Sequence, residues 1–229
     1  MPTFHVIEYD SVGSTSDEAL RLARRGAAHG TVVTAREQTA GRGRAGRKWD
    51  SPPGNLYLSV LLRLDLPPAR IAELSFVAAL AVADMVDAVL PGSACLKWPN
   101  DVLVEGAKVA GILVEQIEGV VIAGIGVNIA HSPSGTAYLV TSLVGRASLT
   151  VAQARDLLLA VLSRRLDAWL AGGFPPIRAD WLARAHPPGT ALRAGSIDGT
   201  FVTLDADGAL LLDTKQGRRR VVAGEVQPR

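Results

Sequence analysis

The chain has 229 residues, 48% of them hydrophobic and 20% charged, and its 24 basic and 22 acidic side chains give a formal net charge of +2. This is the composition of an ordinary globular protein; it excludes collagen-like and disordered classes, and the near balance of charge argues against a protein that simply coats nucleic acid. Cys95 is the single cysteine, which excludes an internal disulfide and a cysteine-cluster metal site and indicates a reducing, intracellular compartment.

No export or membrane signal is evident. Met1–Glu8 lacks both a basic segment and an apolar segment of the signal-peptide kind. The most apolar stretch, Ile71–Leu90, is interrupted by Glu73, Asp84 and Asp87, whereas a membrane-spanning helix needs about 20 nearly uncharged residues. We therefore expect a core helix there, and a cytoplasmic protein without a membrane partner.

The first half of the chain predicts strands mixed with helices. A strand is expected over Phe4–Tyr9, followed by a helix that begins with a capping box at Thr15 and Glu18 and ends near Gly26. Further elements are expected as a strand over Thr31–Arg36, a long loop over Gln38–Asn55, a strand over Leu56–Leu64 and an amphipathic helix over Ala69–Val89.

The second half predicts hairpins, two helices and a β tail. The elements are short strands at Cys95–Trp98 and Val102–Val104, a hairpin of Lys108–Ile117 with Val120–Ile129, and helices over Thr150–Ala171 and Pro175–Ala185. In the tail, turn signals stand at Asp198-Gly199, Asp207-Gly208 and Gln216-Gly217. Since regular βαβ alternation is absent, we expect an α+β fold with a mixed sheet packed against helices, divided into a main domain (1–186) and a small β-barrel (187–229).

The most unusual segment is the basic loop, defined here as Gly41–Trp49. It places four cations and three glycines in eight residues without an acid, a combination that suits a cradle for phosphate or carboxylate. Its glycines match G-x-G-x-x-G, but the run leads into Ser51-Pro52-Pro53 rather than a helix, so a Rossmann site is rejected; the P-loop pattern also fails. A solvated basic loop that touches nucleic acid remains the alternative.

Three further motifs are candidates for chemistry. Lys97-Trp98-Pro99-Asn100-Asp101 places charged groups around a rigid corner, although a purely structural turn has the same composition. In a regular strand Lys108 shares a face with Ala110 and Ile112, at the end of an apolar surface, where many lysines are merely solvated. Alternate glycines in Gly124-Ile125-Gly126 clear one strand face for a flat ligand or for a crossing helix. Together these groups suit a reaction that brings two anions together.

The ordered motifs resemble those of biotin–protein ligases. They are Ser14-Thr15, Gln38-Thr39-Ala40-Gly41-Arg42-Gly43-Arg44, Lys97-Trp98-Pro99-Asn100-Asp101, Lys108-Val109-Ala110-Gly111-Ile112-Leu113 and Gly124-Ile125-Gly126-Val127-Asn128. The resemblance implies a class II synthetase-like core with an SH3-like C-terminal barrel. It implies that biotin and ATP-Mg²⁺ give biotinyl-5′-AMP, from which biotin passes to one lysine of a biotin carboxyl carrier protein of a biotin-dependent carboxylase.

The resemblance also implies roles for individual residues. Biotin is expected to contact Ser14, Thr15, Gln38, Gly41, Arg42, Gly43, Arg44, Lys108, Gly111 and Gly124. The nucleotide is expected to contact Arg44, Arg47, Trp49, Asn100, Lys108 and Asn128. The implied catalytic residues are Arg44, Lys97, Asp101 and Lys108, and no metal ligand of the protein's own is expected. Within these sets, Trp49 stacks on adenine, Asn128 bonds its edge, and Asp101 positions or deprotonates the incoming lysine.

Two related enzyme activities are alternatives to biotin ligation. A lipoate ligase or octanoyl transferase has a similar core, and Gln38 with the arginine-rich loop favours biotin over these. The first family motif begins at Ser14, which leaves no room for the N-terminal DNA-binding domain of some members, so no DNA partner is expected. A homodimer is possible.

Overall fold

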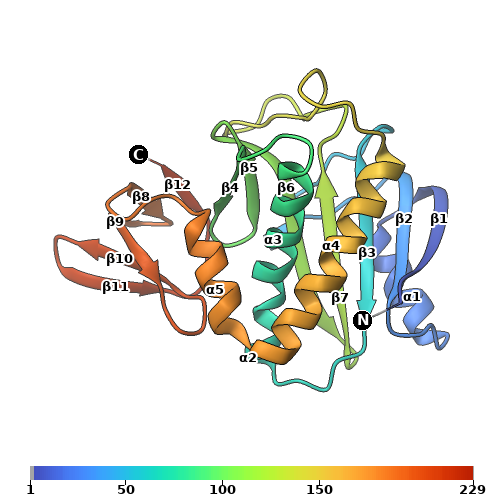
Figure 1. Ribbon diagram of the computed structural model, residues 1–229, viewed down its shortest axis with the longest axis horizontal. Coiled ribbons are helices and arrows are strands. Elements are labelled where there is room, and N and C mark those ends of the chain that lie inside the picture. The colour runs from blue at the N-terminus through green and yellow to red at the C-terminus, as the bar shows by residue number, and fades with distance from the viewer. Residues whose placement is uncertain (1–2, 229) are drawn as a thin grey trace.

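The computed structural model describes residues 3–228, without the side chain of Pro228, and contains two sheets (Figure 1). Met1, Pro2 and Arg229, the outer residues of the two expected domains, lie outside the described residues. The larger sheet has the order β1-β2-β3-β7-β6-β5-β4. Its strands are β1 (His5–Val12), β2 (Thr31–Gln38), β3 (Leu56–Leu62), β4 (Ala94–Lys97), β5 (Asp101–Val104), β6 (Ala107–Ile117) and β7 (Val120–Val127).

The larger sheet is mixed, as the sequence predicts. The strands β1 and β2 are parallel because α1 (Thr15–Arg24) connects them, and every other neighbouring pair is antiparallel. One face packs against α3 (Leu74–Asp87) and α4 (Val151–Gly172), and α1 packs on β2, β3 and β7 (Figure 1). Of the helices in the described part of the chain, none is long and apolar enough to span a membrane.

The apolar stretch is a core helix, but it is neither continuous nor amphipathic. It divides into α2 (Pro68–Ala72) and α3 at Glu73, whose N–H bonds back to the carbonyl of Arg70 at 3.2 Å. The Glu73 carboxylate is buried and accepts from Trp169 Nε1 at 2.6 Å. Buried residues lie on every side of α3 because the sheet contacts one side and α4 and α5 (Phe174–Ala183) contact the others. The expectation of one amphipathic helix over Ala69–Val89 is therefore wrong.

The start of α1 also differs from the expectation. The N-cap residue is Ser14, and no side chain caps the helix. Thr15 lies inside the helix, and its hydroxyl contacts Gln38 Oε1 at 3.1 Å and Ser59 Oγ at 2.8 Å. Glu18 accepts from Tyr9 and Arg21. The expected capping box is wrong because both of its side chains are bound to other partners. By contrast, the capping box of Thr150 with Gln153 opens α4.

The C-terminal unit is an antiparallel sheet that is not closed. Its order is β11-β10-β9-β8-β12, which leaves β11 and β12 as edges. The strands are β8 (Ala191–Ala194), β9 (Ile197–Leu204), β10 (Leu210–Thr214), β11 (Gly217–Val221) and β12 (Val226–Pro228). The expected turn at Asp198-Gly199 is wrong: both residues lie in β9, where a Cβ on Gly199 would come within 2.7 Å of the Asp213 carbonyl oxygen. The chain turns earlier, at Gly195, with φ +59°.

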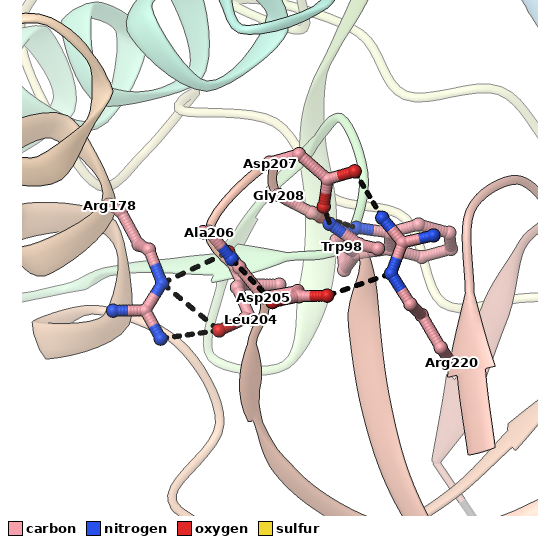
Figure 2. A network of polar contacts seen from close by, with 9 residues as sticks. Trp98, Arg178, Leu204, Asp205, Ala206, Asp207, Gly208 and Arg220 are labelled. Carbon is pink, nitrogen blue, oxygen red and sulfur yellow. Dashed lines mark hydrogen bonds and ion pairs between the residues drawn. The ribbon is translucent and has the colours of Figure 1, made fainter.

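The two sheets meet at the corner that follows β4. The Trp98 indole donates to the Gly208 carbonyl at 2.9 Å, as Figure 2 shows. Arg220 pairs with Asp205 and Asp207 around the same turn, and Arg178 on α5 donates to the Leu204 carbonyl (Figure 2). The turn that supports the corner is therefore itself held by ion pairs and hydrogen bonds.

His186 lies in the connection between the two sheets, and we expect it to make the free energy of unfolding depend on pH. Its Nε2 is buried without a hydrogen-bond partner among the described residues, so burial lowers the pKa of His186, and the nearby Lys97 charge lowers it further. The unfolded chain then binds this proton more readily, at an ordinary pKa of about 6.5. Stability should be full above that pH and fall as pH decreases through the folded pKa. Urea unfolding at pH 7.5 and 5.5 should show a smaller difference for His186→Phe than for the wild type; equal differences would refute this account.

Candidate functional site

A cavity opens where the start of α1, the basic loop and strands β5–β7 meet. It is lined by most of the residues singled out from the sequence. These are Ser14, Thr15, Gln38, Arg42, Gly43, Arg44, Arg47, Trp49, Asn100, Asp101, Lys108, Gly111 and Gly124. A neighbouring cavity is lined by Asn128 and also borders Trp49 and Lys108. Gly41 and Lys97 line neither cavity.

A β-bulge places Lys108 on the cavity face of the sheet. Asp101 pairs with Gly111 and Val102 with Ala110, but Leu103 pairs with Lys108, so Val109 is an extra residue in β6. The alternation of faces is thereby shifted by one residue. A Cβ on Gly111 would lie 3.3 Å from Lys108 Cε. The expectation that Lys108 shares a face with Ala110 and Ile112 is therefore wrong.

Lys97, Asp101 and Lys108 form a buried ionic cluster. Asp101 Oδ2 lies 2.8 Å from Lys97 Nζ and Asp101 Oδ1 lies 2.6 Å from Lys108 Nζ. The side chains of Lys97, Asp101 and Lys108 are 8%, 5% and 12% exposed, respectively. Two ammonium groups share one carboxylate, so the cluster carries a net positive charge at the cavity. Lys97 does not line the cavity itself, and it is connected to the cavity by its ion pair with Asp101.

Thr15, Ser16 and Gln38, which line the cavity, belong to a network of uncharged polar groups. Gln38 Oε1 accepts from the Thr15 amide at 2.8 Å, and Gln38 Nε2 donates to Ser51 Oγ at 2.9 Å. Ser59 Oγ lies 2.8 Å from Thr15 Oγ1 and 3.0 Å from Ser16 Oγ. Such a network fixes the direction of each donor and acceptor before a ligand enters.

The loop arginines differ in their partners. Arg42 is paired with Asp17 through two contacts of 2.6 and 2.7 Å, and Arg47 with Glu225 at 2.6 Å. Arg44 donates to Asn100 Oδ1 at 3.2 Å and, within residues 3–228, has no carboxylate in ion-pair distance. Burial, aided by the Arg47 charge, lowers the pKa of Arg44, although a guanidinium stays charged at neutral pH. Arg44 is therefore the arginine of the loop that forms no ion pair with a described carboxylate.

The Trp49 indole packs directly against the backbone of Gly111 and Gly126. A Cβ on Gly126 would come within 2.6 Å of the indole, and one on Gly111 within 3.0 Å. The indole Nε1 is buried with no hydrogen-bond partner among the described residues. Gly124 instead faces the start of α1, where its Cβ would lie 2.9 Å from Ser16 Oγ. The alternate glycines thus admit a flat ring at one position and a helix end at the other.

Gly41 has a role inside the basic loop itself. A Cβ there would lie 2.5 Å from the Trp49 carbonyl oxygen and 2.6 Å from Ser51 Oγ. The Trp49 amide also donates to the Gly41 carbonyl at 2.9 Å. The absent side chain therefore lets the loop close on itself next to Trp49.

Sequence reasoning missed Ser59 and Tyr138. Ser59 is fully buried, and the sequence did contain an indication of its role. It is the single serine in a strand, Leu56–Leu62, whose other residues are five aliphatic side chains and one tyrosine. Tyr138 borders both cavities. It comes from an irregular segment after β7, so no periodicity indicated where it would lie.

The chain is similar to known ligases along most of its length. Residues 10–132 match the biotin/lipoate A/B protein ligase family, and residues 190–229 match the biotin protein ligase C-terminal domain. A biotin–[acetyl-CoA-carboxylase] ligase of Paracoccus denitrificans is 40% identical, with 93% of this chain and 96% of that protein covered. One of Mycobacterium tuberculosis is 39% identical, with 93% and 85% covered. The biotin protein ligase of Aquifex aeolicus in complex with biotin and ATP superposes with a TM-score of 0.85, at 29% identity and 98% coverage of both chains.

Proposed function

The chain belongs to the biotin/lipoate A/B protein ligase family, and from that premise we propose that it is a biotin–[biotin carboxyl carrier protein] ligase. It activates biotin with ATP and transfers the biotinyl group to a lysine of the carrier protein. The observation that supports this best is the positive charge of Arg44, which forms no ion pair with a described carboxylate, together with the Lys97–Asp101–Lys108 cluster, beside a polar pocket.

In the first step a carboxylate oxygen of biotin attacks the α-phosphorus of ATP. Biotinyl-5′-AMP forms and pyrophosphate leaves. Both reacting groups are anions, so fixed cations are needed at the point where they meet. We assign this role to Arg44 and Lys108, with Lys97 adding charge through Asp101.

The uncharged end of the pocket suits the ureido head of biotin. A buried urea needs donors and acceptors on both edges, and Ser14, Thr15 and Gln38 supply hydroxyl and amide groups there. Gly43, Gly111 and Gly124 line the same pocket and are assigned to contacts with biotin. Arg42, paired with Asp17, is assigned to the same end of the pocket.

The smaller cavity suits the nucleotide base. Asn128 Nδ2 donates to the Thr141 carbonyl at 3.1 Å, which leaves Asn128 Oδ1 to accept from an exocyclic amino group such as that of adenine. Trp49 offers the stacking surface, and Arg47 and Asn100 lie toward the phosphates. Mg²⁺ would bind together with the ATP phosphates and offset their charge.

In the second step the carrier lysine attacks the acyl carbon, an amide forms and AMP leaves. Asp101 is our candidate for orienting or deprotonating that amine. Both of its oxygens already contact ammonium groups, which favours orientation of an incoming amine over proton removal. We assign the basic loop to covering the adenylate and excluding water from the anhydride.

The finer assignments are also proposals. We assign 1–186 to the catalytic domain and 187–229 to the C-terminal domain, with a class II synthetase-like core and an SH3-like C-terminal unit. A cytoplasmic location is expected for an enzyme that uses ATP and a carboxylase carrier, and a homodimer fits the same function.

Incubation with ATP, Mg²⁺, biotin and an apo carrier domain tests the function. We expect biotin on the carrier, detected with streptavidin, and no label when the acceptor lysine of the carrier is replaced by arginine. Lipoate added in excess should not lower the labelling. Absence of label with an active carrier would refute the assignment, and labelling with lipoate instead would reassign the enzyme to the lipoate branch.

A further inference from the structure

Tyr138 contacts both lysines of the ionic cluster. Its ring centroid lies 5.7 Å from Lys97 Nζ and 5.4 Å from Lys108 Nζ. Trp49 lies on the same ammonium group of Lys108, with its ring centroid 5.3 Å away. Lys108 is thus placed by one carboxylate and two aromatic faces, and Lys97 by the carboxylate and Tyr138.

The main chain around Tyr138 is anchored to β6 at Lys108. The Lys108 amide donates to the Leu139 carbonyl at 2.8 Å, and the Thr141 amide donates to the Lys108 carbonyl at 2.9 Å. Asn128 Nδ2 also holds the Thr141 carbonyl. The ring is therefore tied to the same strand that carries Lys108, so its distance from the ammonium groups is set by the sheet.

The chemistry of this contact is specific to an aromatic face. A ring attracts an ammonium group through its quadrupole and, unlike a carboxylate, does not neutralise the charge. Two lysines with a single carboxylate repel one another, and a second acid would remove the positive charge that an anionic substrate needs. A ring face holds both ammonium groups in place and leaves that charge available.

We propose that Tyr138 is a positioning residue that holds Lys97 and Lys108 for the phosphate of the nucleotide, a proposal that rests on the proposed function. Its ring face, and not its hydroxyl, does this. A phenylalanine at position 138 should therefore still position the two lysines, and a leucine should not.

Two readouts test the proposal. In ¹H–¹³C spectra of lysine-labelled protein, the ε-methylene signals of Lys97 and Lys108 should be shifted upfield in the wild type and in Tyr138→Phe. In Tyr138→Leu the Lys97 signal should return to its ordinary position, whereas the Lys108 signal should keep only the part of its shift that Trp49 causes. In pyrophosphate release with biotin and ATP, Tyr138→Leu should lower kcat/KM for ATP about ten-fold, with the KM for biotin and the thermal midpoint unchanged, while Tyr138→Phe stays within about two-fold of the wild type. The matched control is Leu139→Ala, a change at an exposed neighbour that should change neither readout.

Each outcome decides the proposal. Unshifted lysine signals in the wild type, unchanged kinetics in Tyr138→Leu, or equal loss in Tyr138→Phe would overturn it. A wild type that releases no pyrophosphate with biotin would refute the proposed function instead. Calorimetric titration with ATP alone would then decide the role of the ring, since Tyr138→Leu should still weaken ATP binding and Tyr138→Phe should not.

Discussion

Replacing Arg44 by alanine is expected to lower the rate of adenylate formation about a hundred-fold, the usual effect of removing one preorganised group that stabilises charge in a transition state. Arg42 and Arg47 are held by Asp17 and Glu225, whereas Arg44 has no such partner among the described side chains. In the mechanism proposed above, its charge acts where the biotin carboxylate meets the α-phosphate. Single-turnover pyrophosphate release, measured without carrier, reports this step alone.

The control for Arg44→Ala is Lys48→Ala. Lys48 lies in the same loop and also lines the cavity, but its side chain is 78% exposed and its nearest carboxylate, Asp50, lies at 3.6 Å. A solvated charge of this kind contributes little, so the rate should change less than about three-fold. Unchanged pyrophosphate release and unchanged adenylate retention in Arg44→Ala would refute the role of its charge.

Asp101→Asn is expected to lower the free energy of unfolding by about 3 kcal/mol, because removing one partner of a buried ion pair leaves charge uncompensated. Here the two buried ammonium groups of Lys97 and Lys108 lose the carboxylate they share. The amide can accept from one lysine, so we expect the low end of the range observed for buried pairs. Urea unfolding at neutral pH measures the change.

Asp50→Asn is the matched control for this prediction. It makes the same chemical change at an exposed acid that lies 3.6 Å from Lys48, and should cost less than about 1 kcal/mol. A loss in Asp101→Asn as small as that of the control would show that the buried lysines do not depend on the carboxylate.

The motifs could be found in the sequence because their residue types are unusual together. Four cations among three glycines have few structural explanations, and the structure brings Arg44, Arg47 and Lys108 to one cavity. Strand alternation was the weaker guide. It assigned Lys108 to the wrong face of the sheet because it assumes a regular strand. The extra residue Val109 arises from the pairing register with β5, which the sequence of β6 alone does not reveal.

Partners distant in the chain could not be predicted either. The pairing of Arg42 with Asp17 depends on how the loop lies over α1, and that of Arg47 with Glu225 depends on how the two sheets dock. The predicted capping box of α1 was wrong for a related reason. A local capping pattern competes with tertiary hydrogen bonds, and here the Thr15 hydroxyl contacts Ser59 and Gln38 instead. No sequence pattern indicated the position of Tyr138, because it lies in a long irregular segment that brings it into contact with Lys97 and Lys108.

The contact between Arg47 and Glu225 joins residues separated by 178 positions. A ribosome that adds roughly 5–20 residues per second makes Glu225 some 10–35 s after Arg47. Once Val127 has been made, the larger sheet has all of its strands, yet until the C-terminal sheet follows the basic loop lacks this anchor and the corner at Trp98 lacks the carbonyl of Gly208 (Figure 2). The contact that Glu225 makes with the basic loop can therefore form only after the C-terminal sheet has been synthesised.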